Sequence, residues 1–469
     1  MHYAIWEAIT VAAMFACTEA WLVPVIQVRL GAAAHLIGFL TWVPQLAAMV
    51  IGPFAGRLIA GWGGARSTAI AAAWVQGGLT TLVAVPLLFE GWSGAPYLAL
   101  ALAAAAAIAG MICGIAWLSW MGDLVPEAVR GRYIGYRGRW FILTKLLFAL
   151  FFMGVVKVFP YDPALAGSAG GIPPSPWGLF AIVIIGGAGR MVAAWLMGFQ
   201  PAGRSRMKAL PASHRTAAAG ELGLSRFLRT MPATDLGRWT IVWATFNLGW
   251  FVAAPFFGAY MQASVEQGGL GLAGQPERYW LLLWTSTLVR LLMYPVAGRL
   301  VELVGPAAAM RLALPGMALL PLGWAASQDY SFLLVIEVGS GLVWSIGDCA
   351  IQAMFFGCHR DPAVRAKLIG FHAAVCSVAL VVGTLIGQTL LAKRVLPPLN
   401  PADVGTFASL FILSGILRVP GVILAFRLLP RARRLDADDW RSLVERLPGG
   451  GWATEAWGEA ADAVRPRRR

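Results

Sequence analysis

Residues 53–63 read PFAGRLIAGWG, and residues 295–305 read PVAGRLVELVG. Pro, Ala, Gly, Arg and Leu occupy the same places in both stretches, each stretch ends in Gly, and the second copy follows the first by 242 positions. Both copies lie where a long apolar run ends and a short basic loop begins. A repeat at half the chain length predicts two similar halves.

The composition indicates a membrane protein. The 469 residues are 58% hydrophobic and 13% charged, whereas soluble domains are about 25% charged. The first apolar run begins close to Met1 with no basic region before it, so we expect a spanning anchor and no cleaved signal peptide. The five cysteines are scattered, without CxxC spacing or a histidine at metal-ligand spacing. We therefore expect no disulfide, no metal site and no cofactor.

Twelve apolar segments are long enough to span a bilayer, which takes about 20 residues. The first six lie at 5–28, 35–56, 68–89, 96–121, 140–159 and 177–199. The second six lie at 239–261, 279–298, 307–327, 331–356, 369–391 and 405–427. The pattern predicts an all-α membrane protein with two pseudo-symmetric six-helix bundles, 1–199 and 239–429. Residues 200–238 are then a cytoplasmic central loop. Residues 430–469 are a cytoplasmic tail with a short amphipathic helix, which lies on the membrane surface or docks on the bundle.

The distribution of basic residues orients the chain. With a cytoplasmic N-terminus, the predicted inner segments contain 28 of the 37 Lys and Arg residues, and the outer loops contain five. Cytoplasmic loops of membrane proteins carry such an excess. We therefore expect both termini in the cytoplasm and anionic lipid, not nucleic acid, as the partner of these charges. The arginine-rich, lysine-poor composition is typical of a GC-rich bacterial genome, so we expect the protein to lie in a bacterial inner membrane. Separately, we expect a monomer.

With its twelve predicted spans, its central loop and its doubled motif, the chain resembles the major facilitator superfamily (MFS) over about residues 5–427. The motif of that superfamily, after the second and eighth spans, is G-x-L-x-D-x-x-G followed by basic residues. Both glycines and the leucine match in both copies, but the acidic position holds Ala60 in the first copy and Glu302 in the second. The fourth predicted span lacks the arginine of drug–proton antiporters, so the subfamily stays unassigned.

A second paired element precedes the fifth and eleventh spans, where Arg130 and Arg365 each follow a proline and precede an Ile-Gly pair. The resemblance implies that Glu302 acts as a latch, binding helix-end amides and an arginine when the cytoplasmic side is closed. An acid at Ala60 would do the same if Arg130 or an amide lies in reach. The alternatives are loops that only anchor topology and a Glu302 that pairs loosely with Arg299 or Arg311. The gating candidates are Gly56, Arg57, Arg130, Gly298, Arg299, Glu302 and Arg365.

Ionisable residues inside a bilayer are costly, which makes each of them a functional candidate. Glu19 lies about 21 Å into the first predicted span, and Arg290 lies about 16 Å from the opposite face. We therefore expect the two at a substrate or proton site between the halves. The alternative is that Arg290 pairs with Glu337 or Asp348 inside one half. The substrate and coupling-ion candidates are Glu19, Asn247, Arg290, Glu337 and Asp348.

Arg190 and Arg418 occupy equivalent places in the sixth and twelfth predicted spans. These helices are peripheral in the superfamily, so we expect structural roles for both arginines.

The function that these features favour is secondary transport of a small solute by alternating access, coupled to protons. An uncoupled uniporter is the nearer alternative, and a polytopic membrane enzyme or lipid-handling protein is the alternative from a different class. No predicted span carries a paired His/Asp constellation, a DxxD cluster or a G-x-S-x-G elbow, and the chain has no G-x-x-x-x-G-K-[ST] loop. We therefore expect neither an enzyme nor an ATP-driven pump.

Overall fold

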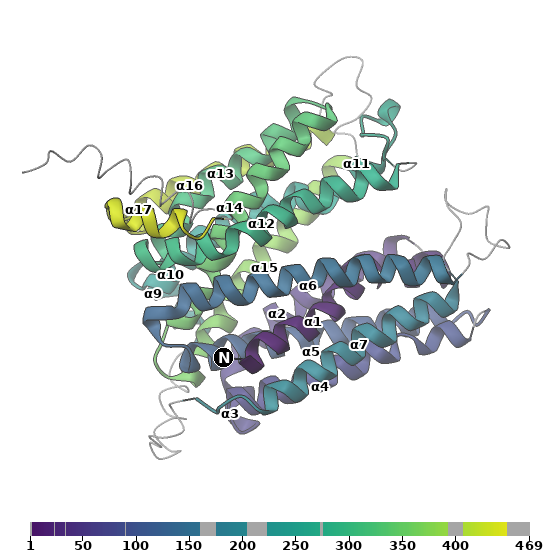
Figure 1. The fold of residues 1–469 in the computed structure, drawn as a ribbon, viewed down its shortest axis with the longest axis horizontal. Coiled ribbons are helices and arrows are strands. Elements are labelled where there is room, and N and C mark those ends of the chain that lie inside the picture. The colour runs from purple at the N-terminus through teal and green to yellow at the C-terminus, as the bar shows by residue number, and fades with distance from the viewer. Residues whose placement is uncertain are drawn as a thin grey trace, which may run out of the picture.

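The computed structural model describes residues 2–22, 24–32, 34–89, 91–159, 175–203, 223–272, 275–392 and 407–447. Parts of the predicted central loop (204–222) and tail (448–469) therefore lie outside the described residues. In Figure 1 the long helices run in two groups, one from each half of the chain, which come together at the end where the N-terminus lies.

The first half contains six spanning segments, and three of them combine an α-helix with a shorter helical stretch. They are α1 (His2–Ala20) with the π-helix η1 (Pro24–Arg29), α2 (Ala34–Ile51) with η2 (Gly52–Phe54) and α3 (Ala55–Gly61), α4 (Ala65–Leu82) with η3 (Val85–Leu88), α5 (Ala95–Leu124), α6 (Arg130–Val158), which follows η4 (Glu127–Val129), and α7 (Pro176–Gly198).

The second half repeats this arrangement. Its spanning segments are α10 (Asp235–Ala253) with η8 (Ala254–Phe256) and α11 (Phe257–Gln262), α12 (Pro276–Val304), α13 (Pro306–Ala326), α14 (Tyr330–Gly357), α15 (Pro362–Ala392) and α16 (Phe407–Leu428). The remaining helices among the described residues are short: α9 (Leu224–Thr230), η7 (Met231–Ala233), η9 (Val265–Gln267) and, near the C-terminus, α17 (Ala437–Val444). Proline begins four of the spanning helices, because the first turn of a helix leaves its N–H groups unbonded in any case.

Among the described residues, eleven helices are long and apolar enough to cross a membrane. α1 is the twelfth spanning segment: it packs against α6 and α7 but is less apolar, because it contains Glu7 and Glu19. The prediction of an all-α membrane protein with twelve spanning segments is confirmed. The predicted bounds were too short at one end, since α6 begins at Arg130, ten residues before its predicted span. A predicted span covers only the apolar residues and stops at the first charged ones. The helix itself extends through those charged residues to its capping residue.

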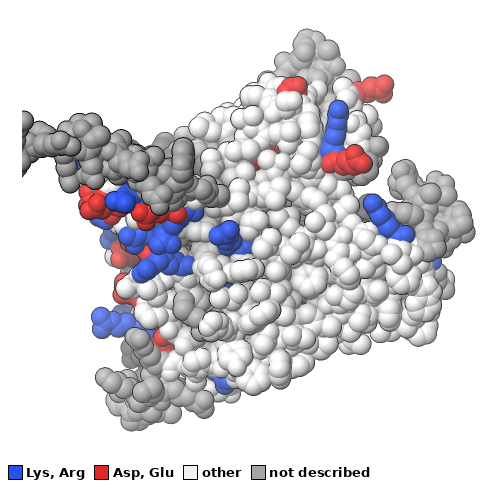
Figure 2. All heavy atoms as spheres, viewed as in Figure 1, with Lys and Arg blue, Asp and Glu red and all other residues white. Residues whose placement is uncertain are grey.

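Lys and Arg side chains gather at one end of the molecule, which we call the basic end. Figure 2 shows them at the left, where the N-terminus and α17 lie in Figure 1, next to a broad uncharged surface. The two halves meet at this end, where α6 packs on α12 and α15 packs on α2 and α3. Glycine permits both approaches: a Cβ on Gly131 would overlap the carbonyl oxygen of Gly298, and one on Gly370 would overlap that of Gly52.

The terminal helix α17 docks on α12, which is one of the two placements that the sequence left open. A capping box between Asp436 and Asp439 begins this helix, and Arg433 pairs with Asp439 at 2.7 Å. Leu443 is buried, whereas Trp440 is 54% exposed. The helix therefore uses a narrow apolar face and a charged clamp to hold the bundle.

Candidate functional site

A cavity of about 880 Å³ lies between the two halves. Spanning helices of both halves line it: α1, α2, α4, α5, α6 and α7 from the first, and α10, α12, α14 and α15 from the second. Its size suits a small-molecule ligand. We call it the central cavity, and its charged side chains form one group in each half.

In the first half, Glu7 on α1 forms an ion pair with Arg137 on α6, with 2.7 Å between Oε2 and Nη2. The side chains of Glu7 and Arg137 are only 3% and 15% exposed. The Arg137 guanidinium lies over the indole of Trp117 on α5, 4.3 Å from the ring centroid. An opposite charge and a π face replace water around this buried cation. Sequence patterns do not predict this pair, because Arg137 lies outside the predicted fifth span (140–159) and Glu7 lies near the edge of the predicted first span (5–28).

Arg190 on α7 lies on the same wall of the central cavity and is 6% exposed. Its Nε donates to Oε1 of Gln76 on α4 at 2.8 Å, and its Nη2 contacts Sγ of Cys113 on α5 at 2.8 Å. Both partners are neutral. Hydrogen bonds to neighbouring helices of the same half fit the expected structural role, and Arg190 also lines the central cavity. Arg418, the equivalent residue in α16, instead donates to the carbonyl of Met317 at 2.6 Å.

In the second half, Arg290 on α12 pairs with Asp348 on α14 at 3.2 Å. The Tyr294 hydroxyl donates to the same carboxylate oxygen at 3.0 Å, and the Arg290 guanidinium lies 5.5 Å from the ring centroid of Trp344. This is the pairing inside one half that the sequence left as the alternative. Glu337 lies nearer the other end of α14, outside the lining of the central cavity, where it accepts a hydrogen bond from the Trp324 indole at 3.2 Å.

Glu19 is not brought together with Arg290. Its carboxylate accepts a hydrogen bond from Lys145 on α6 at 2.9 Å, and its side chain is 55% exposed. Twelve residues separate Glu19 from Glu7, which is about 18 Å along a helix axis. Of these two glutamates, Glu7 lines the central cavity and Glu19 does not. The expected site between Glu19 and Arg290 is therefore corrected to two separate ion pairs.

Asn247 on α10 lines the central cavity from the second half. Its side chain is 5% exposed, and its Oδ1 has no hydrogen-bond partner among the described residues. Beside it on α10, Trp250 packs on Trp344, with 4.5 Å between ring centroids. A buried acceptor without a partner is costly, so Asn247 is suited to accept a hydrogen bond from a bound solute.

At the basic end, Glu302 on α12 contacts α6 across the two halves. Its Oε1 accepts hydrogen bonds from the backbone N–H of Arg132 at 2.8 Å and from Nε of Arg132 at 3.1 Å. Arg299 donates to its other oxygen at 3.3 Å, whereas Arg311 donates to the carbonyl of Leu429. Arg132 is the third residue of α6, so its N–H is one of the free amides at a helix start. These contacts have the form that the latch hypothesis expects.

The first copy of the motif makes a different contact. A Cβ on Gly56 would lie 2.9 Å from the Cβ of Lys367 on α15, and Arg57 is exposed. The start of α15 is capped within its own chain segment, because Asp361 accepts from the backbone N–H of Ala363 at 2.7 Å and of Val364 at 3.1 Å. An acid at the position of Ala60 would therefore find these helix-start amides already bound.

The two loop arginines hold helix ends together by binding carbonyl oxygens. Arg365 donates to Ser119 of the first half and, at 2.7 Å, to His359. Arg130 donates to the carbonyls of Gly122 and Val125 at 3.3 and 3.4 Å. Of the two, Arg365 joins the two halves through the hydrogen bonds named here.

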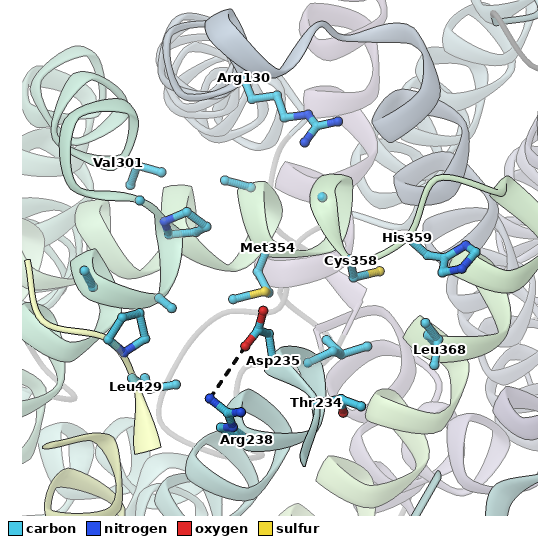
Figure 3. A pocket seen from close by; sticks show the side chains of 18 of the residues that line it. Arg130, Thr234, Asp235, Arg238, Val301, Met354, Cys358, His359, Leu368 and Leu429 are labelled. Carbon is cyan, nitrogen blue, oxygen red and sulfur yellow. Dashed lines mark ion pairs between the residues drawn. The ribbon is translucent and has the colours of Figure 1, made fainter. Parts of the chain in front are cut away.

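A second cavity of about 980 Å³ lies at the basic end, lined by residues of both halves. Figure 3 shows Arg130 on one side of it and the ion pair of Asp235 and Arg238 on another. Burial raises the pKa of the Cys358 thiol in its wall to about 12, so this thiol is protonated at neutral pH. Within the described ranges, no group of three or more His, Cys, Asp or Glu side chains is placed to hold a metal ion.

Several solved transporter structures have a similar fold. The proton:xylose symporter XylE bound to 6-bromo-6-deoxy-D-glucose matches with a TM-score of 0.66 at 13% identity, over 91% of this chain and 94% of that chain. The MFS transporter FucP in the outward conformation matches with a TM-score of 0.66 at 14% identity, over 91% and 98%. A bacterial homologue of the iron transporter ferroportin in an outward-facing state gives 0.63 at 13% identity, over 91% and 98%.

No protein-family model matches the sequence, and no curated protein matches it. At 13–14% identity, the structural likenesses concern the fold. They extend over nine tenths of the chain, and they confirm the fold that the twelve spans and the doubled motif predict. This membrane protein has the fold of the major facilitator superfamily.

Proposed function

We propose that this protein is a secondary transporter that moves a small solute across a bacterial plasma membrane by alternating access. The observation that supports this most directly is the central cavity, whose wall both halves build. The glycine contacts of Gly131 with Gly298 and of Gly52 with Gly370 close the basic end. Separating these contacts while the opposite end closes would present the same cavity to the other side of the membrane, which is what alternating access requires.

We propose that transport is coupled to protons through Glu7. Its carboxylate is almost fully buried and is held by Arg137 on a different helix. Protonation of Glu7 removes the charge that holds Arg137, so the cavity wall is rearranged when a proton binds. Glu19 is less suited to this role, because its side chain is 55% exposed and lies outside the central cavity.

The experiment for coupling compares the two glutamates of α1. A thermal-shift screen of purified protein against sugars, amino acids, organic anions and drugs first identifies a solute. That solute is then tested in proteoliposomes under an imposed pH gradient. Glu7→Gln is expected to abolish accumulation against the gradient and to retain solute counterflow, whereas Glu19→Gln accumulates normally.

Loss of accumulation in Glu19→Gln alone would assign the proton to that residue. Solute flux that ignores the pH gradient in the native protein would identify an uncoupled uniporter. No flux of any solute identified by binding would favour a membrane enzyme or lipid-handling protein.

In this proposal the basic end is cytoplasmic, which places both termini in the cytoplasm and anionic lipid headgroups next to the arginines. Reporter fusions at Ala202 and Ala432 are expected to report the cytoplasm, and a fusion at Ala169 the outer side. An outer signal from either of the first two contradicts this topology. Light scattering of the purified protein is expected to give the mass of a monomer.

A further inference from the structure

We infer that the solute is a small organic anion, whose carboxylate or other oxyanion is bound by Arg190 and Arg137 in the first-half wall of the central cavity. This inference rests on the proposed transport function, since it names the class of solute that the same cavity takes. Its basis is the balance of charge in the cavity wall, the hydrogen-bond donors left without acceptors there, and the apolar lining beyond them.

The ionisable groups in the first-half wall of the central cavity carry an excess of positive charge. Glu7 and Asp348 line the cavity together with Arg137 and Arg190, and Asp348 is already paired with Arg290 behind it. Glu7, Arg137 and Arg190 in the first-half wall therefore have a net charge of +1. A buried charge without a counter-ion is unfavourable, and an anionic ligand supplies the missing charge.

The uncompensated cation is Arg190. Glu7 is bound to Arg137, so the two hydrogen-bond partners of Arg190 are the neutral side chains of Gln76 and Cys113. Its Nη1 has no hydrogen-bond acceptor among the described residues. Because a guanidinium presents a planar fork of donors, it binds an oxyanion through two parallel hydrogen bonds.

Two further donors close to this site lack acceptors. Nε of Arg137 and the indole Nε1 of Trp117 are both buried without a partner among the described residues, and the two side chains stack on each other. An oxyanion offers several acceptor lone pairs and no donor, so one group can serve donors from Arg190, Arg137 and Trp117. A sugar or an amine supplies fewer acceptors and leaves the excess charge in place.

The rest of the central cavity is suited to the body of such an anion. Phe15 and Phe141 line it from the first half, in edge contact with 5.3 Å between ring centroids. Trp243 and Trp250 line it from the second half, where the unpartnered Oδ1 of Asn247 is ready to accept a hydrogen bond. This lining favours an anion with an aromatic or apolar body and a hydroxyl or N–H group.

Protonation of Glu7 would strengthen this site. Four groups face Glu7 from the helices around it: Arg137 and Tyr133 on α6, Cys113 on α5 and Arg190 on α7. When Glu7 takes a proton from water, the net charge of the wall rises from +1 to +2 and Arg137 becomes free to bind the anion. Proton and anion therefore bind together, and their joint transfer carries no net charge for a monovalent anion.

The first experiment measures ligand binding to the native protein in detergent, by thermal shift and tryptophan fluorescence. Three probes of one shape are compared: 3-(4-hydroxyphenyl)propionate, its uncharged amide, and the cation tyramine. Inorganic phosphate is a fourth probe, for an oxyanion without a body. The carboxylate is expected to bind at least about tenfold more tightly than the amide or tyramine. Equal or stronger binding of the amide or the cation overturns the inference.

The second experiment tests the assigned arginine. Arg190→Gln is expected to weaken carboxylate binding about 10- to 100-fold, which is the usual loss for a charged hydrogen bond, and Arg190→Lys to weaken it less. Arg139→Gln is the matched control, because Arg139 is an exposed arginine on α6, and its binding is expected to be unchanged. Unchanged binding in a folded Arg190→Gln overturns the assignment. If that variant does not fold, the assignment is tested by carboxylate binding to Arg190→Lys, and the class of solute by the comparison of the three probes on the native protein.

These measurements are made without a membrane gradient, so they fail separately from the proposed function. Tight carboxylate binding without flux in proteoliposomes would reject transport and keep the anion site. Proton-driven flux of an uncharged solute would keep transport and reject the anion.

Discussion

The two copies of the repeated motif close the same end of the molecule in different ways. Backbones come into contact through glycine on both sides: Gly298 of the second copy on Gly131, and Gly52, directly before the first copy, on Gly370. The second copy adds a charged contact, since Glu302 binds the start of α6. The first copy has Ala60 at that place, and the facing helix is capped by its own Asp361. Backbone packing is therefore duplicated, whereas within the described residues a carboxylate of the motif binds a helix start only in the second copy.

The C-terminal segment with α17 adds further hydrogen bonds to the side of the second motif copy. Arg433 donates to the carbonyl of Leu303 at 3.0 Å, and Arg299, which holds Glu302, donates to Ser442 of α17 at 3.1 Å. The α6–α12 side is therefore connected through its latch to a docked terminal helix. The α5–α15 side is joined instead by Arg365, which donates to the carbonyl of Ser119. We expect the carboxylate latch to act on the α6–α12 side, and the variants below test that difference.

The largest effect is expected from the glycine contact itself. In Gly131→Ala the added Cβ meets the backbone carbonyl of Gly298, which cannot rotate away. Overpacking costs about 1–3 kcal/mol, and we expect the upper end, which opens the basic end about 100-fold more often. The measurement is the maleimide labelling rate of Cys358, followed by mass spectrometry. The Cys358 side chain is partly buried and its pKa is raised by burial, so opening is expected to accelerate the reaction. Gly154→Ala, on the same helix with no atom in reach, is the control, and equal rates in both variants would contradict the close approach.

The latch comes next in size. Glu302→Ala removes a carboxylate that is 8% exposed from an arginine that is 45% exposed, so the charged hydrogen bonds are partly screened. We expect a loss of about 1–2 kcal/mol and a 5- to 30-fold shift toward the state open at the basic end. Cys358 labelling should rise accordingly and net transport should fall. Glu127→Ala changes an exposed acid beside the same helix start and should leave both unchanged. If Glu302→Ala also leaves Cys358 labelling and net transport unchanged, Glu302 is a solvated loop acid and not a latch.

The docking of α17 is expected to contribute less and to depend on pH. A hydrogen bond from Arg433 holds the pKa of the Asp439 carboxyl below its ordinary value. A depressed pKa in the folded state means that the clamp is fully present above the ordinary carboxyl pKa of about 3.9 and is lost as the pH falls through the lower folded value. Hydrogen exchange of 437–444, measured relative to the intrinsic rate at each pH, should therefore be slow at pH 7 and become faster below about pH 4. Arg433→Gln should accelerate it at pH 7, and a rate independent of this variant would exclude the clamp.

Sequence patterns were sufficient for the fold because apolar spans are local properties of the chain and the doubled glycine motif can be read directly from it. The Ile-Gly pairs did mark close approaches, since a Cβ on Gly135 or Gly370 would meet the backbone of the other half. The charged site was not predictable in the same way. Glu19 and Glu7 lie on one helix, and only the packing of α6 and α7 decides which of them meets a buried arginine. Arg137 was not predicted to lie on a spanning helix, because the charged residues in the first turns of α6 are not part of the apolar window. The helix begins at Arg130, ten residues before that window.

The smallest effect is expected where the first copy is made to look like the second. Ala60→Asp supplies the missing acid, but the amides of Ala363 and Val364 already bind Asp361, and Arg130 is bound to the carbonyls of its own loop. The new carboxylate at an exposed position has only Coulomb attraction left, which contributes about 0.3–1 kcal/mol near a helix start. Cys358 labelling should change less than about fivefold, compared with the larger change in Glu302→Ala. Combining Ala60→Asp with Asp361→Ala frees the amides, so the double variant should label more slowly than Asp361→Ala alone. If Ala60→Asp by itself slows labelling as strongly as Glu302→Ala accelerates it, the two sides are equivalent and the inequality between the gates does not exist.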